Sequence, residues 1–194
     1  MRQKFTTLSS TVVPLPIENI DTDQIIPARF LKATTREGFG ENLFRDWRYD
    51  KDGNPKPSFV MNSPIYKGEI LVAGKNFGCG SSREHAAWAI DGAGFRAVVS
   101  SFFADIFRNN ALNNGLLPVV VSEEMLAEIF KAAEENASME LHIDLPAQTI
   151  EIIGTEIKES FEIAPYKKQC LMSGYDDVDF LVSIHSEIES FEKR

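Results

Sequence analysis

The sequence predicts one mixed α/β domain that contains both parallel and antiparallel strands. Its 194 residues, of which 43% are hydrophobic, are enough to bury one substantial core. Short apolar runs alternate with helix-like segments in the middle of the chain, and this alternation favours parallel strand pairing. Beyond residue 137 apolar and polar residues alternate with period two, which is typical of half-buried antiparallel strands. We therefore expect a single domain over residues 1–194.

The regular elements are predicted from apolar runs and from the residues that interrupt them. Pro14 and Pro16 break the first apolar segment, so residues 5–26 are expected to form a strand and a turn. Ser122 is expected to cap the helix that follows it. Further strands are expected at residues 69–73, 95–101 and 116–121 and in the segments MELHIDL, QTIEIIG and ESFEIA, and helices from about residue 81 to 92 or 94, at 103–114 and at 123–136.

Two segments stand apart from this regular pattern. Residues 30–64 are rich in Gly, Asn, Asp, Arg and Pro, with aromatic residues scattered among them. This stretch is long for a connection within a compact domain, so we expect it to be a functional loop region. Residues from about 165 to 194 are expected to form a C-terminal helical extension, with helices at 166–172 and 179–192.

The charge and the cysteine count exclude several classes of function. A net charge of −9 and an acidic pI near 4.9 oppose nucleic acid as the main partner, because phosphate binding needs a concentrated basic surface. The first residues lack the apolar stretch of a signal peptide, and no run is long enough to predict a membrane span. Cys79 and Cys170 form no disulfide framework, so a reducing cytoplasmic location is expected. Two thiolates are also too few for an iron–sulfur cluster, which would have to lie on another polypeptide.

The most informative stretch is GCGSSREH, residues 78–85, between a predicted strand and a predicted helix. Backbone N–H groups and the helix dipole favour an anion at such a junction. Gly78 and Gly80 allow a tight turn and a close approach to a ligand. Two hydroxyls and Arg83 follow, and the planar guanidinium of arginine suits a carboxylate.

A purely structural interpretation of this stretch is also open. Ser81 and Glu84 have the spacing of a capping box, which is common at helix starts. Other phosphate and nucleophile motifs fit poorly. The dinucleotide fingerprint needs a third glycine where Arg83 stands, the P-loop needs a Gly-Lys-Ser/Thr triplet, and the nucleophile elbow needs glycine where Glu84 stands.

GCGSSREH resembles the Gly-x-Gly-Ser-Ser-Arg-Glu-His segment in the swivelling domain of the aconitase superfamily. Four further blocks resemble the small subunit of bacterial 3-isopropylmalate dehydratase, and all five occur in the order of that family over nearly the whole chain. The four blocks are NIDTDQIIPARFL (19–31), GFGENLFRDWRYD (38–50), SFFADIFRNNALNNGLLPV (101–119) and CLMSGYDDV (170–178).

The resemblance implies a fold, a reaction and a partner. The fold is a swivelling β/β/α domain that closes over a large subunit, and the assembly is a heterodimer. The reaction is the interconversion of 2-isopropylmalate and 3-isopropylmalate through 2-isopropylmaleate, in leucine biosynthesis. The cofactor, a 4Fe–4S cluster, belongs to the large subunit, where an iron can act as a Lewis acid on the leaving hydroxyl. No cofactor or metal is expected on this chain, and no nucleic acid or membrane partner.

The resemblance also implies roles for four residues. Ser81 matches the base of the superfamily motif, which takes a proton from carbon as an alkoxide. Ser82 and Arg83 are expected to hold a carboxylate of the dicarboxylate substrate. Arg36, in the loop after IIPARFL, lies roughly where the superfamily places another substrate-binding arginine, although a solvated surface arginine is an equal alternative. Cys79 and His85 are expected to be structural.

Other functions remain open at this point. A relative acting on another hydroxy-diacid, of the homoaconitase, citraconate or dimethylmalate type, would carry the same catalytic motif. An RNA-binding regulator with an aconitase-like ancestor is opposed by the acidic charge. A serine hydrolase using Ser81 is opposed by the absence of a Ser/His/Asp pattern around the motif.

Overall fold

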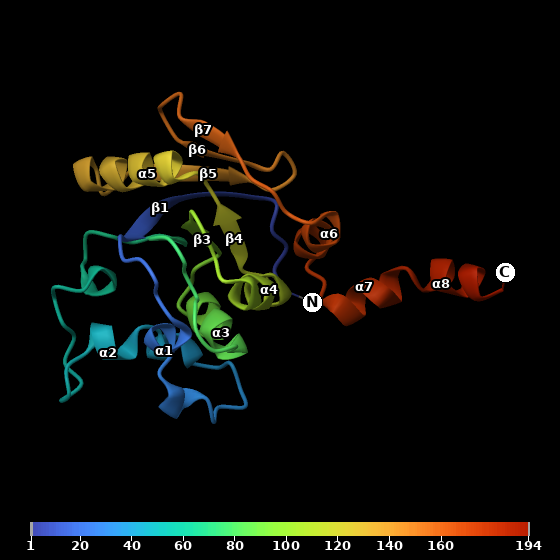
Figure 1. Ribbon diagram of the computed structural model, residues 1–194, viewed down its shortest axis with the longest axis horizontal. Helices are drawn as coiled ribbons and strands as arrows, with labels where there is room; N and C mark the ends of the chain where they lie inside the picture. Colours follow the sequence, from blue (N-terminus) through green and yellow to red (C-terminus); the bar gives the residue numbers. More distant parts are fainter. Residues whose placement is uncertain (1, 194) are drawn as a thin grey trace.

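The computed structural model describes residues 2–193, and over these residues seven strands form one sheet (Figure 1). The order of the strands is β4-β3-β2-β1-β5-β6-β7. Their bounds are β1 Thr7–Leu15, β2 Ile70–Ala73, β3 Ala97–Ser100, β4 Leu117–Val120, β5 Glu140–Asp144, β6 Thr149–Ile152 and β7 Lys158–Ser160.

Strand β1 joins a parallel half and an antiparallel half of this sheet. It pairs in parallel with β2, where Val12 is opposite Ile70, and the parallel pairing continues through β3 to β4. On its other edge it pairs antiparallel with β5, where Ser9 is opposite His142, and the antiparallel pairing continues to β7. The predicted α/β class with mixed parallel and antiparallel strands is therefore confirmed.

Helices and helical turns cover both faces of the sheet. Successive strand residues point to opposite faces, so Val12 and Ile70 pack into the core beneath α5, whereas Val13 and Leu71 pack into the core beneath α3 and α4. With η denoting a 3-10 helix, the bounds are α1 Thr22–Ile25, η1 Ala28–Phe30, η2 Phe39–Asn42, α2 Arg45–Arg48, η3 Val60–Asn62, α3 Glu84–Gly92, α4 Asp105–Asn113, α5 Glu123–Glu135, α6 Pro165–Ser173, α7 Asp177–Ser183 and α8 His185–Glu192.

Most predicted elements are present, and four details differ. Helix α1 lies in the segment predicted as strand and turn. Helix α3 begins at Glu84, three residues later than predicted. The segment predicted as a long loop contains three short helical turns, η2, α2 and η3, which are too short to show a periodic pattern. The predicted last helix is two helices, α7 and α8. Ser183 Oγ donates a hydrogen bond to the carbonyl of Phe180 at 2.7 Å at the end of α7, a local bond that competes with the continuing helix.

The segment that precedes β2 is held against the end of α3 by a contact between two glycines. A Cβ atom placed on Gly40 would lie 2.1 Å from the carbonyl carbon of Gly92, so the two backbones can meet only because position 40 has no side chain. Beyond this contact, the rings of Phe44, Trp47 and Phe59 pack together. Residues 39–62 therefore form a layer fixed to α3.

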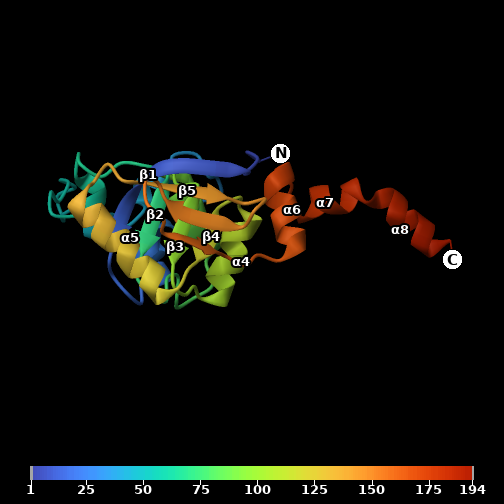
Figure 2. The ribbon, with the colours of Figure 1, turned by 90° about the horizontal axis from the view of Figure 1, so that it is seen from above.

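The C-terminal helices extend away from the domain (Figure 2). Helix α6 still contributes Cys170 and Leu171 to the buried residues, whereas α7 and α8 bury none. Large apolar side chains are exposed on this arm at Val178, Leu181, Val182 and Phe191. Within residues 2–193, each helix is too short or too polar to cross a lipid bilayer.

Candidate functional site

The GCGSSREH stretch forms the turn between β2 and α3, and its glycines are required by the backbone. Gly78 has a φ of +75°, and a Cβ atom on it would lie 2.2 Å from the ring of Phe107. Gly80 has a φ of +90°, and a Cβ atom there would lie 3.3 Å from Cβ of Asp21. Side chains at these positions would meet both backbone strain and close neighbours.

The turn is fixed by hydrogen bonds to the segment that follows β1. The carbonyl of Ile20 accepts bonds from the backbone N–H groups of Gly78 and Cys79, at 2.8 and 3.2 Å. In return, the N–H of Thr22 donates to the carbonyl of Cys79 at 2.9 Å. The hydroxyl of Thr22 donates to the carbonyl of Ser81 at 2.8 Å. Two of the sequence blocks, about 60 residues apart in the chain, therefore build one local structure.

Ser81 and Ser82 lie exposed just before α3, and neither caps it. Among residues 2–193, no hydrogen bond involves either hydroxyl group. The chain is still extended at Arg83, the N-cap residue, which has a φ of −141° and makes no side-chain cap. The capping-box interpretation of Ser81 is therefore wrong, because the bond from Thr22 holds the Ser81 backbone outside the helix. The first N–H groups of α3 remain without a side-chain acceptor and favour an anion nearby.

The guanidinium of Arg83 lies beneath this turn, with its side chain only 12% exposed. Its Nη1 donates to the carboxylate of Asp23, which is itself half exposed, and to the carbonyl of Ile26 at 3.3 Å. These two acceptors fix the direction of the guanidinium group. The structure thus brings Ser81, Ser82 and Arg83 together at the start of α3.

Arg36 occupies a different place. Its guanidinium carbon lies 4.7 Å from the ring centroid of Trp88, and its Nη2 lies 3.7 Å from Oε1 of Glu84. Among the described residues, no hydrogen bond or ion pair links Arg36 to the segment 81–83. Its side chain is 44% exposed. The structure places Arg36 against Glu84, the residue that follows Arg83, without a direct bond to the other three candidates, and its substrate role stays a prediction.

The comparisons with known proteins agree with the arrangement of these blocks. The model of the aconitase C-terminal domain matches residues 2–124, more than half of the chain. A 3-isopropylmalate dehydratase small subunit from Cytophaga hutchinsonii is 69% identical over 98% of this chain and 95% of its own length. The protein of the same name from Christiangramia forsetii is 62% identical, over 99% of this chain and 94% of its own. The chain belongs to the family of 3-isopropylmalate dehydratase small subunits.

A solved structure extends this family relationship to the fold. The crystal structure of 3-isopropylmalate dehydratase (leuD) from Methanocaldococcus jannaschii aligns with a TM-score of 0.67 at 26% sequence identity. The alignment covers 96% of this chain and 99% of that one. The family expected from the sequence blocks is confirmed, together with its aconitase-like domain.

His85 has a structural environment in this member of the small-subunit family. Its Nε2 lies 3.1 Å from the carbonyl of Ala33, and its ring packs against Phe39 and Trp88, with centroids 5.5 and 4.5 Å away. These contacts tie the loop that carries Arg36 to the first turn of α3. The position of this loop therefore depends on His85.

Residues that support the site were missed from the sequence. Glu84 accepts hydrogen bonds from Trp88 at 3.3 Å and from the buried Asn114 at 3.2 Å. Asp23 and Thr22 hold Arg83 and the Ser81 backbone, as described above. The last two stand in the block NIDTDQII, so the family resemblance could have drawn attention to them. Asn114 stands in the block SFFADIFRNNALNNGLLPV, at the end of a predicted helix, but its distance from the motif in sequence gave no signal of a contact with Glu84.

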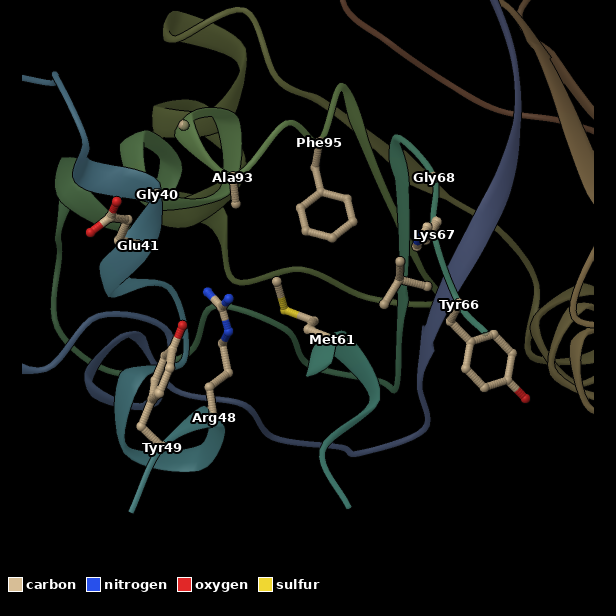
Figure 3. A pocket seen from close by; sticks show the side chains of 12 residues that line it. Gly40, Glu41, Arg48, Tyr49, Met61, Tyr66, Lys67, Gly68, Ala93 and Phe95 are labelled. Atoms are coloured by element: carbon tan, nitrogen blue, oxygen red, sulfur yellow. The ribbon is translucent and has the colours of Figure 1, made fainter. Parts of the chain in front are cut away.

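Figure 3 shows a hollow of about 410 Å³ at the opposite end of α3, between Gly92 and the residues that precede β2. The side chains of Arg48, Met61 and Phe95 point toward one another across it. None of the four candidate residues lines this hollow. The motif therefore forms an open surface site, separate from this pocket.

The described residues do not provide a metal centre. Within residues 2–193, no group of three or more His, Cys, Asp or Glu side chains could hold a metal ion. Cys79 and Cys170 are both free thiols. Burial raises the pKa of the Cys170 thiol and so disfavours its thiolate form. An iron–sulfur cluster does not fit the donors of this chain.

Proposed function

We propose that the chain is the small subunit of a hydro-lyase that interconverts 2-isopropylmalate and 3-isopropylmalate through 2-isopropylmaleate, in cytoplasmic leucine biosynthesis. One observation carries the proposal. The exposed hydroxyls of Ser81 and Ser82 lie at an uncapped helix start beside the largely buried Arg83. The names of the relatives, at 69% and 62% identity over nearly the whole chain, supply the substrate.

Ser81 is proposed as the catalytic base. Its alkoxide takes the proton from the carbon next to the hydroxyl-bearing carbon of the substrate. The electrons of that C–H bond form the double bond while the C–O bond breaks and hydroxide leaves, so the proton on Ser81 and this hydroxide together make up the water that is lost. Hydration in the other orientation adds the hydroxide to the neighbouring carbon and returns the proton from Ser81 to the carbon that had carried the hydroxyl. The uncapped N–H groups of α3 favour the alkoxide, because they direct partial positive charge toward the preceding residues.

Ser82, Arg83 and Arg36 are proposed to bind the substrate carboxylates. Arg83 is held by Asp23, so a substrate carboxylate must use the remaining donors of its guanidinium or displace Asp23. To reach the substrate, Arg36 would have to leave Glu84 and Trp88. Because its side chain is exposed, breaking these contacts costs little free energy. Closure of residues 28–38, the segment that carries Arg36 (the 28–38 loop), would bring it to the substrate.

The site is proposed to be completed by a large subunit that holds a 4Fe–4S cluster, in a heterodimer. Two observations support this. The described residues lack a metal-binding group, and large apolar side chains are exposed around the motif. Ile17 follows β1, Phe102 follows β3, and Ile106 lies at the start of α4, so all three lie at the end of the parallel strands where the motif lies. An exposed apolar surface of this kind suits a protein partner.

The test is reconstitution of the two subunits. The chain is purified alone and after anaerobic co-expression with a candidate 3-isopropylmalate dehydratase large subunit, and both samples are assayed with 2-isopropylmalate. Activity is expected only in the co-expressed sample. Parallel assays with citraconate and dimethylmalate distinguish related hydroxy-diacid dehydratases. Turnover by the isolated chain, or an assembled complex that is inactive on isopropylmalate, would contradict the proposal.

A further inference from the structure

A small arginine-rich cavity lies beside α3, apart from the Ser81 turn. Its volume is about 230 Å³. Three arginines and one carboxylate contribute its charged groups, and they come from the N-terminal segment, the 28–38 loop, α3 and the residue before β3. The lining residues are Arg2, Gln3, Arg36, Asp91, Arg96, Asn114 and Gly115.

Two of the arginines are held in place by the N-terminal segment. The backbone N–H of Arg2 donates to the carbonyl of Gly174 at 2.9 Å, and its side chain lies over Gly115. Arg96 Nη2 donates to the carbonyl of Lys4 at 3.1 Å, and its guanidinium lies over the ring of Phe5. The guanidinium of Arg96 is therefore positioned before any ligand binds, whereas Arg2 is anchored through its backbone.

The charges around the cavity are not balanced. Asp91 makes no ion pair within 4 Å with an arginine among residues 2–193, and Glu84 pairs only with Arg36, at 3.7 Å. Nη1 of Arg2 is buried and has no hydrogen-bond partner among these residues. A buried donor without an acceptor is costly, and one in a cavity lined by further arginines indicates a missing anion.

The pKa of Asp91 reflects its surroundings in the cavity. Desolvation raises the pKa of its carboxyl group, and this effect outweighs the attraction of Arg36, Arg96 and Arg2. Asp91 as a residue is exposed, however, so the cavity stays open to water on its side. The arginines offer donors in planar groups, which suit carboxylate and phosphate oxygens.

We propose that this cavity binds a small dianion, a dicarboxylate or a phosphate, between Arg2 and Arg96. The inference goes beyond the proposed catalytic function and does not rest on it, because neither Arg2 nor Arg96 belongs to the Ser81 site. A bound dianion would supply the missing acceptor for Arg2 Nη1. Arg36, proposed above to bind substrate, lines the cavity in this structure but is not required to bind the dianion.

The test is isothermal titration calorimetry of the full chain with inorganic phosphate and, separately, with succinate, at constant ionic strength. Saturable binding of at least one probe is expected. Arg2→Gln and Arg96→Gln should each weaken it by roughly tenfold or more, because each removes a charge-assisted hydrogen bond. Arg45→Gln is the matched control, since Arg45 stacks on Tyr49 outside the cavity, and it should bind as the parent does.

The outcomes separate the alternatives. Binding of phosphate alone, of succinate alone or of both supports the site and identifies the ligand class. Absence of saturable binding for both probes would overturn the proposal. Unchanged affinity in both cavity variants, or equal weakening by Arg45→Gln, would also overturn it, because the anion would then bind elsewhere. Thermal unfolding of each variant confirms that the fold is retained.

Discussion

The parallel and antiparallel halves of the sheet differ in the burial of their strands and in whether candidate site residues lie at the ends of those strands. Every residue of β2 and β3 is buried, because helices cover both faces there, whereas β5 and β6 alternate between buried and partly exposed residues. None of the four candidate residues lies in residues 137–164, the antiparallel half. Parallel strands end at the same edge, so the connections that follow them converge. The antiparallel strands return after short turns and present no such convergence.

The largest expected effect tests whether the parallel half carries the chemistry. Ser81→Ala and Ser81→Gly both remove the proposed base, so kcat of the assembled enzyme should fall by about 10²–10⁴-fold. Both variants should unfold at the urea concentration of the parent, because Ser81 does not cap α3 and its hydroxyl makes no hydrogen bond among the described residues. Steady-state kinetics and urea titrations measure the two quantities.

A control for this prediction lies in the antiparallel half. Ser160→Ala removes a hydroxyl from the end of β7, far along the sheet from the motif, and should leave kcat unchanged. Near-normal turnover in Ser81→Gly would refute the assignment of Ser81 as the base. A large loss in Ser160→Ala would show that activity is sensitive to the sheet as a whole.

Arg83→Lys should have the next largest effect. Lysine keeps the charge but loses the planar guanidinium, so KM should rise by roughly tenfold or more, with a smaller loss of kcat. Arg108→Lys is the matched control, because Arg108 donates to the carbonyl of Glu162 and so connects α4 with the antiparallel half. An unchanged KM in Arg83→Lys would argue that Arg83 only anchors Asp23.

Two glycine substitutions compare the packing of the two halves. Gly78 and Gly154 both have positive φ, +75° and +84°, so alanine should strain each backbone by about 1–2 kcal/mol. Only Gly78 faces a neighbour, the Phe107 ring, whereas nothing lies within 4 Å of a Cβ atom on Gly154. Overpacking should therefore add about 1–3 kcal/mol to the loss in free energy of unfolding for Gly78→Ala. Equal losses in urea denaturation would contradict this difference.

The smallest effect concerns the link between the halves. Ser122 Oγ accepts from the N–H of Met125 at 3.0 Å, which caps α5, and donates to Glu159 of β7 at 2.6 Å. Ser122→Ala should lower the free energy of unfolding by about 0.5–2 kcal/mol and leave kcat unchanged. Glu159→Gln keeps the cap and serves as the comparison. A measurable loss of activity in Ser122→Ala would mean that the two halves are coupled more strongly than this contact indicates.

The sequence could predict what is decided locally. The alternation of the β strands and the cap of Ser122 depend on neighbouring residues, and both predictions are confirmed. The capping-box interpretation left open for Ser81 is wrong, because α3 begins only at Glu84 and the Thr22 hydroxyl, 59 residues away in the chain, donates to the Ser81 carbonyl. Helix α1 was missed because it has four residues, although Asp21 and Gln24 form a capping box there.

The place of Arg36 could not be predicted for a similar reason. A family resemblance relates Arg36 to substrate, but its position in this structure depends on stacking against Trp88 and on the bond between His85 and the Ala33 carbonyl. These contacts form only after the 28–38 loop packs on α3. The contacts of Arg83, by contrast, join the motif to one other block of the resemblance, residues 19–31.

The central position of β1 has a consequence for synthesis on the ribosome. This strand is made first, yet one of its two neighbours is β5, which begins only at Glu140. The parallel half is complete once Val120 has emerged, so at about 5–20 residues per second the outer edge of β1 waits roughly 1–5 s for its antiparallel partner. During that time a row of unpaired backbone groups in Thr7–Thr11 is open to pairing with another chain. The newborn chain is therefore most exposed to aggregation at its oldest strand.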